Sequence, residues 1–260
     1  MQEQLTAPKG RDTTKPQSSI SKSIDILFLL ADGETRFSRI GKLLGYANGT
    51  TSRLLKNLID AGMVTQDPLT KDYFLSSDIL KLSARVESSY MQVSLAALPE
   101  MEQLRDLTRE TVTLCKRVGL RKVIVEEITS PHGIKFEYGK GYSSSFHSGA
   151  TGIALLTHLR PQELELLLGQ GPLEQETPTT IVTPNEIDAR IAAARRDGYA
   201  ISFGEVTGGT ASVSVPLDDG TGSYALTCVG PANRFHPQAA AAAVMEAVQR
   251  IETRLRKRPA

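Results

Sequence analysis

Residues 37–61 read FSRIGKLLGYANGTTSRLLKNLIDA, and this stretch decides the fold of the first part of the chain. Its first segment places Phe37, Ile40 and Leu44 at the spacing of one helical face. Gly45 is expected to end that helix, because glycine adopts the left-handed conformation of a helix C-terminus at little cost. A second helix follows a short connector, and we expect Asn48 to cap it. Two helices separated by so tight a turn predict a helix-turn-helix.

A short hairpin is predicted after the two helices. Residues 62–66 begin a strand, residues 67–71 (DPLTK) have the composition of a turn, and residues 72–75 return as a second strand. The order helix, turn, helix and hairpin predicts a winged helix-turn-helix domain. The two helices alone are also compatible with an ordinary pair of amphipathic helices in a small bundle.

The first turns of the second helix carry small hydrogen-bonding side chains and cations. Such groups at this end of a helix can enter the major groove of DNA. We expect Arg53 and Lys56 to contact phosphate or guanine, and Lys71, at the hairpin tip, to contact the DNA backbone. The predicted DNA-binding residues are Asn48, Gly49, Thr50, Thr51, Ser52, Arg53, Lys56, Asn57 and Lys71.

Composition limits the classes of protein to which the chain can belong but does not single out one. A chain of 260 residues with 40% apolar content suits two domains. The net charge is only +1, and residues 1–76 hold ten Lys/Arg against eight Asp/Glu, so there is no strongly basic coat. A modest local patch suffices for DNA, because a few placed side chains and helix N-termini make the phosphate contacts.

Location is predicted from what the sequence lacks. No run approaches the roughly 20 apolar residues of a membrane helix, and the N-terminus has no apolar signal core. Cys115 and Cys228 do not form a spaced motif, so we interpret both as reduced core residues. A cytoplasmic protein without membrane contact is therefore expected.

Periodicity divides the chain into four parts. Residues 1–18 are a polar, flexible arm, whose basic residues either contact DNA or are solvated. Residues 19–76 form the winged helix-turn-helix domain. Residues 77–97 form a linker helix, whose apolar face is either exposed or packs on its own domain. Residues 98–260 form a second domain.

The second domain mixes helices with an antiparallel sheet, which gives the chain an α+β fold. Residues 143–148 are expected to be a loop, with a helix beginning after Ser148. Alternating apolar residues predict strands at 111–118, 122–128, 134–138, 199–203, 210–217 and 223–230.

Two blocks of residues occur in a characteristic order and at a characteristic separation: Ser21, Ile24, Leu27, Leu30, Gly45, Thr50, Ser52–Leu55, Leu58 and Ala61–Val64 in the first domain, and Gly149–Leu156, Gly198–Ile201, Glu205, Pro216, Gly230, Pro231 and Arg234 in the second. Together they resemble the IclR family of bacterial transcriptional regulators. The family usually has Ser at the position of Gly49, an aliphatic residue at Thr51 and Lys at Ile153. The first two departures lie in the reading helix.

The resemblance implies that an exposed apolar face of the linker helix supports dimer contacts, and that the second domain is a GAF-like effector-binding domain. It places the helix start at Gly149–Gly152 in the effector pocket, where backbone N–H groups can bind a carboxylate or similar anion. By position the resemblance implies that the effector-binding residues are Ala150, Thr151, Ser202, Ser212 and Thr227.

Family members that bind small carboxylates often carry an acidic residue at the position of Ser202 and a cysteine at that of Ser212. The hydroxyls here predict a less polar, uncharged pocket and a larger or aromatic organic ligand. The residues that can supply aromatic walls, or else ordinary core packing, are Phe136, Tyr138, Tyr142 and Phe146.

Motifs of catalysis are missing from the sequence. There is no Gly-x-Ser-x-Gly elbow, no His-Glu-x-x-His and no P-loop, and the four histidines are not at ligand spacing. We therefore expect no catalytic residue, metal or cofactor. The leading hypothesis is a regulator that binds a pseudo-palindromic operator as a dimer or tetramer, with repression and activation both open. The alternative is a small-molecule-binding enzyme or sensor whose helical N-terminal domain serves dimerisation.

Overall fold

The computed structural model describes residues 17–220 and 224–257. The chain forms two compact units, Met1–Ser89 and Tyr90–Ala260. Most of the arm predicted at 1–18, including Lys9, Arg11 and Lys15, lies outside the described residues.

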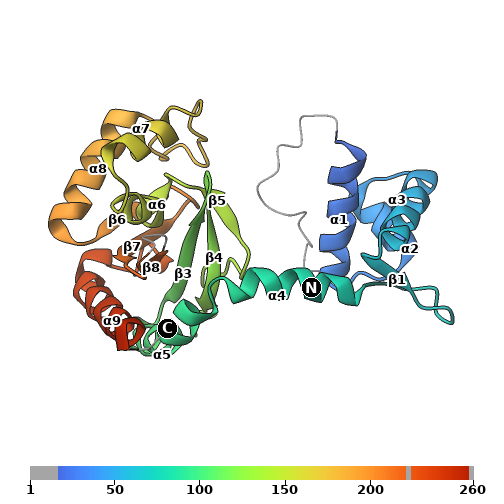
Figure 1. The fold of residues 1–260 in the computed structure, drawn as a ribbon, viewed down its shortest axis with the longest axis horizontal. Coiled ribbons are helices and arrows are strands. Elements are labelled where there is room, and N and C mark those ends of the chain that lie inside the picture. Colours follow the sequence, from blue (N-terminus) through green and yellow to red (C-terminus); the bar gives the residue numbers. More distant parts are fainter. Residues whose placement is uncertain (1–16, 221–223, 258–260) are drawn as a thin grey trace. The chain divides into compact units, whose positions relative to one another are not determined.

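The first unit is a helix-turn-helix with a small hairpin (Figure 1). Its helices are α1 (Ser19–Ala31), α2 (Phe37–Leu44) and α3 (Asn48–Asp60), and its antiparallel hairpin joins β1 (Val64–Gln66) to β2 (Tyr73–Leu75). Gly45 closes α2 at φ 68°, as the sequence predicts. The winged helix-turn-helix is therefore confirmed.

The core of this unit brings α1, α2 and α3 together. Ile26, Ile40 and Leu54 have no exposed surface, and Leu55 and Leu58 pack beside them. Removing each such side chain from water contributes about 1.5–3 kcal/mol. The buried face of α3 fixes its rotation, so the opposite face, with Arg53 and Lys56, is turned to solvent.

The single helix predicted over 77–97 is wrong. The structure has α4 (Ser77–Ser88), which ends at Ser89, and a separate α5 (Met91–Thr108). Pro99 lies inside α5 and not at a helix start. Ser76 caps α4 by accepting a hydrogen bond from the Asp78 amide at 3.2 Å. Both helices were visible as apolar periodicity, but the break at Ser89–Tyr90 carries neither Gly nor Pro to signal it.

The second unit is built on one six-stranded antiparallel sheet in the order β5-β4-β3-β8-β7-β6. Helices α5 and α9 (Pro237–Lys257) cover one face, and α6 (Gly149–Leu156) packs on the other with α8 (Pro184–Asp197) and α7 (Pro161–Leu168) beyond it (Figure 1). The strands are β3 (Thr111–Val118), β4 (Arg121–Ile128), β5 (Ser143–Ser145), β6 (Ala200–Phe203), β7 (Thr210–Leu217) and β8 (Tyr224–Pro231).

Alternation along the strands gives the two faces of the sheet different chemistry. On β7, Val213 and Val215 join the core under α5 and α9, while Ser212 and Ser214 lie on the opposite side. Strand β8 repeats the pattern, with Cys228 in that core and Thr227 on the α6 side. The face under α6 is therefore lined with hydroxyl groups.

Two strand predictions are corrected by the structure. Residues 134–138 are not a strand, and Ile134 is 80% exposed. The third strand of that region is β5, inside the stretch predicted as loop, where Ser143–Ser145 pairs with Val123–Arg121. A strand of three serines has no apolar alternation to reveal it, and only its backbone pairing makes it a strand.

Candidate DNA-binding helix and effector pocket

The start of α3 is open to solvent. It begins after Ala47, which has an extended backbone and makes no side-chain cap, and its first turn contains no acidic residue. The first N–H groups of a helix lack intrahelical partners and carry partial positive charge. This end of α3 can therefore accept an anion such as a DNA phosphate.

Most predicted DNA-binding side chains share one solvent-facing surface. Thr50 is half-buried, and neither Arg53 nor Lys56 forms an ion pair within the described part of the chain. Their charges are therefore available to a partner. The exposed members of the set on α3 are Asn48, Gly49, Ser52, Arg53, Lys56 and Asn57.

Two predictions about α3 are wrong. Asn48 is the first residue of the helix and not its cap. Thr51 is fully buried and its hydroxyl donates to the Ala47 carbonyl at 3.2 Å, so it cannot reach a base edge. A Cβ on Gly41 would lie 3.1 Å from Thr51 Oγ1, so Thr51 packs α3 closely against α2. The buried leucines of α3 fix the orientation of the helix, and in that orientation Thr51 points into the protein.

The hairpin tip holds Lys71 outward in a defined turn. The Asp67 carboxylate accepts from the amides of Leu69 at 2.7 Å and Thr70 at 2.8 Å. Those hydrogen bonds lower the pKa of Asp67. Gln66 Nε2 donates to the Lys71 carbonyl at 2.9 Å, and Lys71 itself has φ 64° and an exposed side chain.

A pocket lies in the second unit between the hydroxyl-rich face of the sheet and the start of α6. It contains about 520 Å³ of unfilled space, part of it open to solvent. All five residues predicted to bind the effector line it: Ala150, Thr151, Ser202, Ser212 and Thr227.

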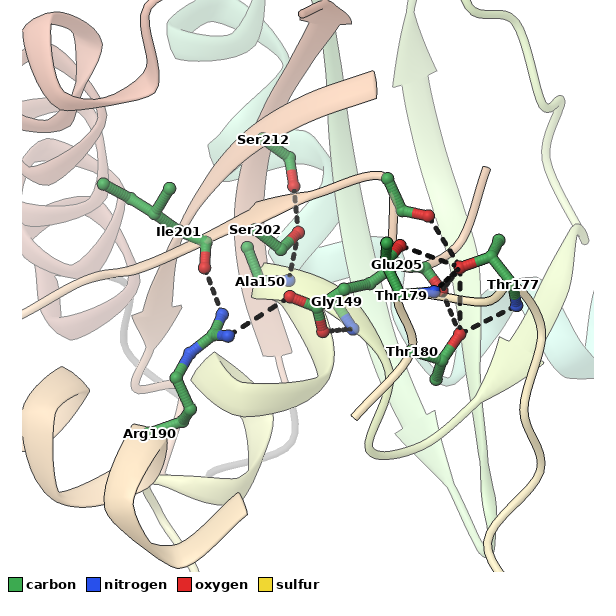
Figure 2. A network of polar contacts seen from close by, with 11 residues as sticks. Gly149, Ala150, Thr177, Thr179, Thr180, Arg190, Ile201, Ser202, Glu205 and Ser212 are labelled. Atoms are coloured by element: carbon green, nitrogen blue, oxygen red, sulfur yellow. Dashed lines mark hydrogen bonds and ion pairs between the residues drawn. The ribbon is translucent and has the colours of Figure 1, made fainter. Parts of the chain in front are cut away.

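Hydrogen bonds arrange these residues in two rows. In the first, the Ala150 amide donates to Ser202 Oγ at 2.9 Å, and Ser202 Oγ lies 2.9 Å from Ser212 Oγ (Figure 2). In the second, Thr151 Oγ1 lies 2.9 Å from Thr227 Oγ1, which lies 2.8 Å from Ser214 Oγ. A hydroxyl can donate or accept a hydrogen bond, so the pocket can bond both donor and acceptor groups of a ligand.

The anion position at the start of α6 is taken by the protein itself. Figure 2 shows the Glu205 carboxylate between the start of α6 and Arg190, accepting from the Gly149 amide at 3.2 Å and from Arg190 Nη1 at 3.2 Å. Arg190 also donates to the Ile201 carbonyl. Gly149 was expected to offer its N–H to a ligand carboxylate, and that expectation is wrong for this amide, because a buried acid from the β6–β7 loop already occupies it.

Lys122 is a pocket residue that the sequence analysis missed. It is buried, and its Nζ donates to the carbonyls of Ser145 at 2.8 Å and Ser148 at 2.6 Å and lies 2.7 Å from Ser148 Oγ. Burial lowers the pKa of Lys122 to about 8. The prediction of an uncharged lining is therefore wrong. Lys122 and Ile124 are two residues apart on one strand, so their side chains point to the same face, and Ile124 also lines the pocket. This spacing could have located Lys122 from the sequence, but a lysine on the buried face of a strand is unusual.

Aromatic and thiol groups complete the lining. Of the four predicted aromatic walls, Tyr138 and Tyr142 line the pocket with ring centroids 5.0 Å apart. Phe146 instead packs in the core around α6, and Phe136 is not among the lining residues. Burial raises the pKa of Tyr138 to about 12 and that of the Cys115 thiol, also in the lining, to about 11.

The two units together define the class of protein. A winged helix-turn-helix with an open, cationic helix start is followed in the same chain by a domain with an interior pocket. This is the arrangement of a ligand-responsive, DNA-binding transcriptional regulator. No cluster of three metal-ligating side chains and no helix suited to crossing a membrane is found in residues 17–220 and 224–257.

Family models identify the particular family. The model for the C-terminal domain of bacterial transcriptional regulator IclR matches residues 87–254, and the IclR helix-turn-helix model matches residues 19–68. The chain belongs to the IclR family of bacterial transcriptional regulators, which confirms the predicted family and fold class.

Individual regulators are similar to this chain over most of their length. The chain is 26% identical to HTH-type transcriptional regulator BhcR of Paracoccus denitrificans over 242 residues, covering 90% of this chain and 85% of BhcR. It is 28% identical to HTH-type transcriptional repressor AllR of Escherichia coli over 225 residues, covering 85% and 83%. The fold matches an IclR homolog of Microbacterium hydrocarbonoxydans complexed with 4-hydroxybenzoate, with a TM-score of 0.71 at 21% identity, covering 93% of this chain and 100% of that one.

Proposed function

We propose that this regulator reads its operator with the exposed start of α3. The observation that carries the proposal is the pair Arg53 and Lys56, exposed and without ion-pair partners in the described chain, beside an uncapped helix N-terminus. Arg53 and Lys56 contact phosphate or guanine, and Lys71 touches the DNA backbone from the wing. The base edges are met by Thr50, Ser52 and Asn57, and Asn48 and Gly49 contact the DNA at the helix start beside them.

The DNA-bound form is a homodimer on a pseudo-palindromic operator. Helix α4 supports a dimer, because none of its residues is buried and Leu80, Leu82 and Val86 are 70%, 59% and 62% exposed. An isolated helix of this length is marginal in water, so a second copy is the natural cover for its apolar side chains. Two α3 helices would then lie roughly 34–36 Å apart, one turn of DNA.

The pocket of the second unit takes a small organic effector. Its hydroxyl rows would bond polar groups of the ligand, and Ile124, Val206 and the Tyr138–Tyr142 pair would contact an apolar or aromatic body. The related fold that was solved with 4-hydroxybenzoate favours an aromatic hydroxy compound of similar size. Effector binding shifts DNA affinity by a coupling of typically about 1–3 kcal/mol.

Fluorescence anisotropy with labelled DNA tests this proposal. DNA from upstream of the protein's own gene and its neighbours is titrated at several salt concentrations, with random DNA of the same length as the control. We expect saturable binding that exceeds random DNA, and a salt dependence whose slope counts the phosphate contacts. Equal affinity for upstream and random DNA at every salt concentration would contradict operator recognition by α3.

A further inference from the structure

Hydroxyl protons in the effector pocket are not all free for a ligand. A serine or threonine hydroxyl has one proton to donate, and its oxygen accepts through two lone pairs. A buried hydroxyl proton with an acceptor in reach bonds within the protein, because leaving it unbonded forfeits its hydration. A ligand can therefore receive only the protons that the internal hydrogen bonds leave over.

The first row, Ser202 and Ser212, keeps a proton for a ligand. The two hydroxyls share a single hydrogen bond of 2.9 Å, so one of their two protons is used. Ser202 Oγ also accepts from the Ala150 amide at 2.9 Å, which occupies a lone pair and no hydroxyl proton (Figure 2). No other hydrogen bond of these two hydroxyls is found in the described part of the chain. Whichever serine donates to the other, this row presents a donor.

The second row, Thr151, Thr227 and Ser214, has no proton left over. Thr227 Oγ1 lies 2.9 Å from Thr151 Oγ1 and 2.8 Å from Ser214 Oγ. Ser214 is fully buried, and its hydroxyl donates to the Leu226 carbonyl at 3.3 Å. With that proton used, Thr227 donates to Ser214 and Thr151 donates to Thr227. This row therefore presents lone pairs to the pocket and acts as an acceptor.

Stronger donors of the lining are already used by the protein. The Gly149 amide bonds Glu205, and the Lys122 ammonium bonds the Ser145 carbonyl and both the carbonyl and the hydroxyl of Ser148. The free proton of the first row is therefore a main donor that the pocket offers.

The two rows are separated by roughly the length of a small aromatic compound. Ser212 and Ser214 are two residues apart on β7, so they lie on one face of the sheet about 7 Å apart. A benzene ring with polar substituents at opposite ends spans such a distance. Tyr138 and Tyr142, whose ring centroids lie 5.0 Å apart, also line the pocket and can contact such a ring.

We propose that the effector is a para-substituted hydroxyaryl carbonyl compound, and that Ser214 sets the direction in which it binds. The carbonyl oxygen receives the proton of the Ser202–Ser212 pair, and the hydroxyl at the other end donates to Thr151 or Thr227. Ser214 is not among the residues that line the pocket, so it is a positioning residue that acts through Thr227. The inference rests on the proposed effector function.

Ser214→Ala should reverse the polarity of the second row. Without Ser214, the hydroxyls of Thr151 and Thr227 share one hydrogen bond and keep one proton, as the first row does. The row can then donate to a ligand acceptor that the wild type leaves unbonded. Ser214→Cys keeps the shape of the side chain but donates weakly, so it should act in the same direction by a smaller factor.

Two probes of equal shape measure this polarity. In 4-hydroxyacetophenone the oxygen opposite the acetyl group carries a proton, and in 4-acetylpyridine N-oxide the corresponding oxygen can only accept. Both are titrated into the full-length chain by isothermal calorimetry at neutral pH. We expect the wild type to favour the hydroxy compound. The ratio of the two affinities should shift toward the N-oxide by about threefold to tenfold in Ser214→Ala, the effect of one hydrogen bond.

Thr113→Val is the matched control. Thr113 lines the pocket opposite Thr227 on the neighbouring strand, but its hydroxyl accepts from Cys115 Sγ at 3.7 Å and bonds neither row. The variant removes a pocket hydroxyl of the same kind at nearly constant shape, and the ratio of affinities should stay at its wild-type value.

The ratio separates the positioning role from simple damage to the pocket, because damage weakens both probes alike. An unchanged ratio in Ser214→Ala, or an equal shift in Thr113→Val, would overturn the role of Ser214 while leaving the effector function intact. No saturable binding of either probe to the wild type would overturn both the ligand class and the effector pocket. The assay contains no DNA, so each of these results is distinct from a failure of operator binding.

Discussion

The starts of α3 and α6 share a local design and differ in what surrounds them. Each follows a residue with extended backbone, Ala47 or Ser148, and neither has an acidic side chain in its first turn. The start of α3 is open to solvent, whereas every residue of α6 is buried and its first amides bond Glu205 and Ser202. The first N–H groups are thus left free for an external anion in α3, whereas in α6 they bond the protein's own side chains and shape an interior pocket. Burial, and not the helix start itself, decides between these uses.

Substituting one glycine in each helix should give the largest contrast. A Cβ on Gly152 would lie 2.5 Å from the His147 carbonyl carbon and 2.8 Å from its oxygen, and backbone cannot move aside cheaply. We expect Gly152→Ala to destabilise the second unit by about 3 kcal/mol or more. Gly49→Ala in α3 meets nothing within 4 Å and should stabilise by up to about 1 kcal/mol. Urea unfolding measures both, and equal effects would remove the contrast.

Removing the cations of α3 should weaken specific DNA binding without unfolding the chain. Arg53→Ala with Lys56→Ala is expected to weaken operator affinity by about 2–4 kcal/mol. The slope of log affinity against log salt concentration should decrease by about two, one for each lost phosphate contact. Anisotropy gives the affinity, and circular dichroism checks the fold.

The charge-matched control for this pair is Arg256→Ala with Lys257→Ala at the end of α9, where both side chains are exposed. It should leave the operator affinity unchanged. If both double variants lost affinity equally, net charge and not the α3 surface would account for binding.

Removing the internal anion of α6 should create a site for an external one. Glu205→Ala leaves the Gly149 amide and Arg190 without their carboxylate, which we expect to cost about 1–3 kcal/mol of stability. Added acetate should restore part of the thermal stability of this variant, because its carboxylate can occupy the vacated position. Chloride at equal ionic strength is the control. Equal responses of variant and wild type to acetate would show that Glu205 does not fill an anion site.

Acid should weaken the second unit through His147, and this is the smallest effect. Burial holds the pKa of His147 below its ordinary value of 6.5, so the unfolded chain binds the proton more readily than the folded chain. The stability contributed by neutral His147 is present above pH 6.5 and is lost as the pH falls through the lowered folded-state pKa. The melting temperature of His147→Phe should therefore decrease less on acidification than that of the wild type. Parallel pH profiles would contradict this.

Local signals explain what the sequence predicted. Gly45 and the apolar spacing of α2 and α3 fixed the helix-turn-helix, since both are short-range features. The hydroxyls at Ser202, Ser212 and Thr227 were located by resemblance, and strand alternation brings them to one face.

Features that depend on tertiary packing were missed. Thr51 is inward because α2 approaches α3 at Gly41, and Lys122 is buried because three oxygens of the segment leading into α6 surround its ammonium group. The anion at α6 comes from Glu205, more than fifty residues away in sequence. Neither periodicity nor composition encodes such pairings, because each requires the folded sheet.

Amide hydrogen exchange of the full-length chain, with and without an operator fragment, tests the central contrast most directly. We predict slow exchange at Gly149 and Ala150 in both states, because Glu205 and Ser202 bond these amides. At Asn48, Gly49 and Thr50 we predict fast exchange in the free protein and protection when DNA is bound. Protection by DNA elsewhere in the chain but not at these three amides would contradict the assignment of α3 as the open, DNA-reading helix start.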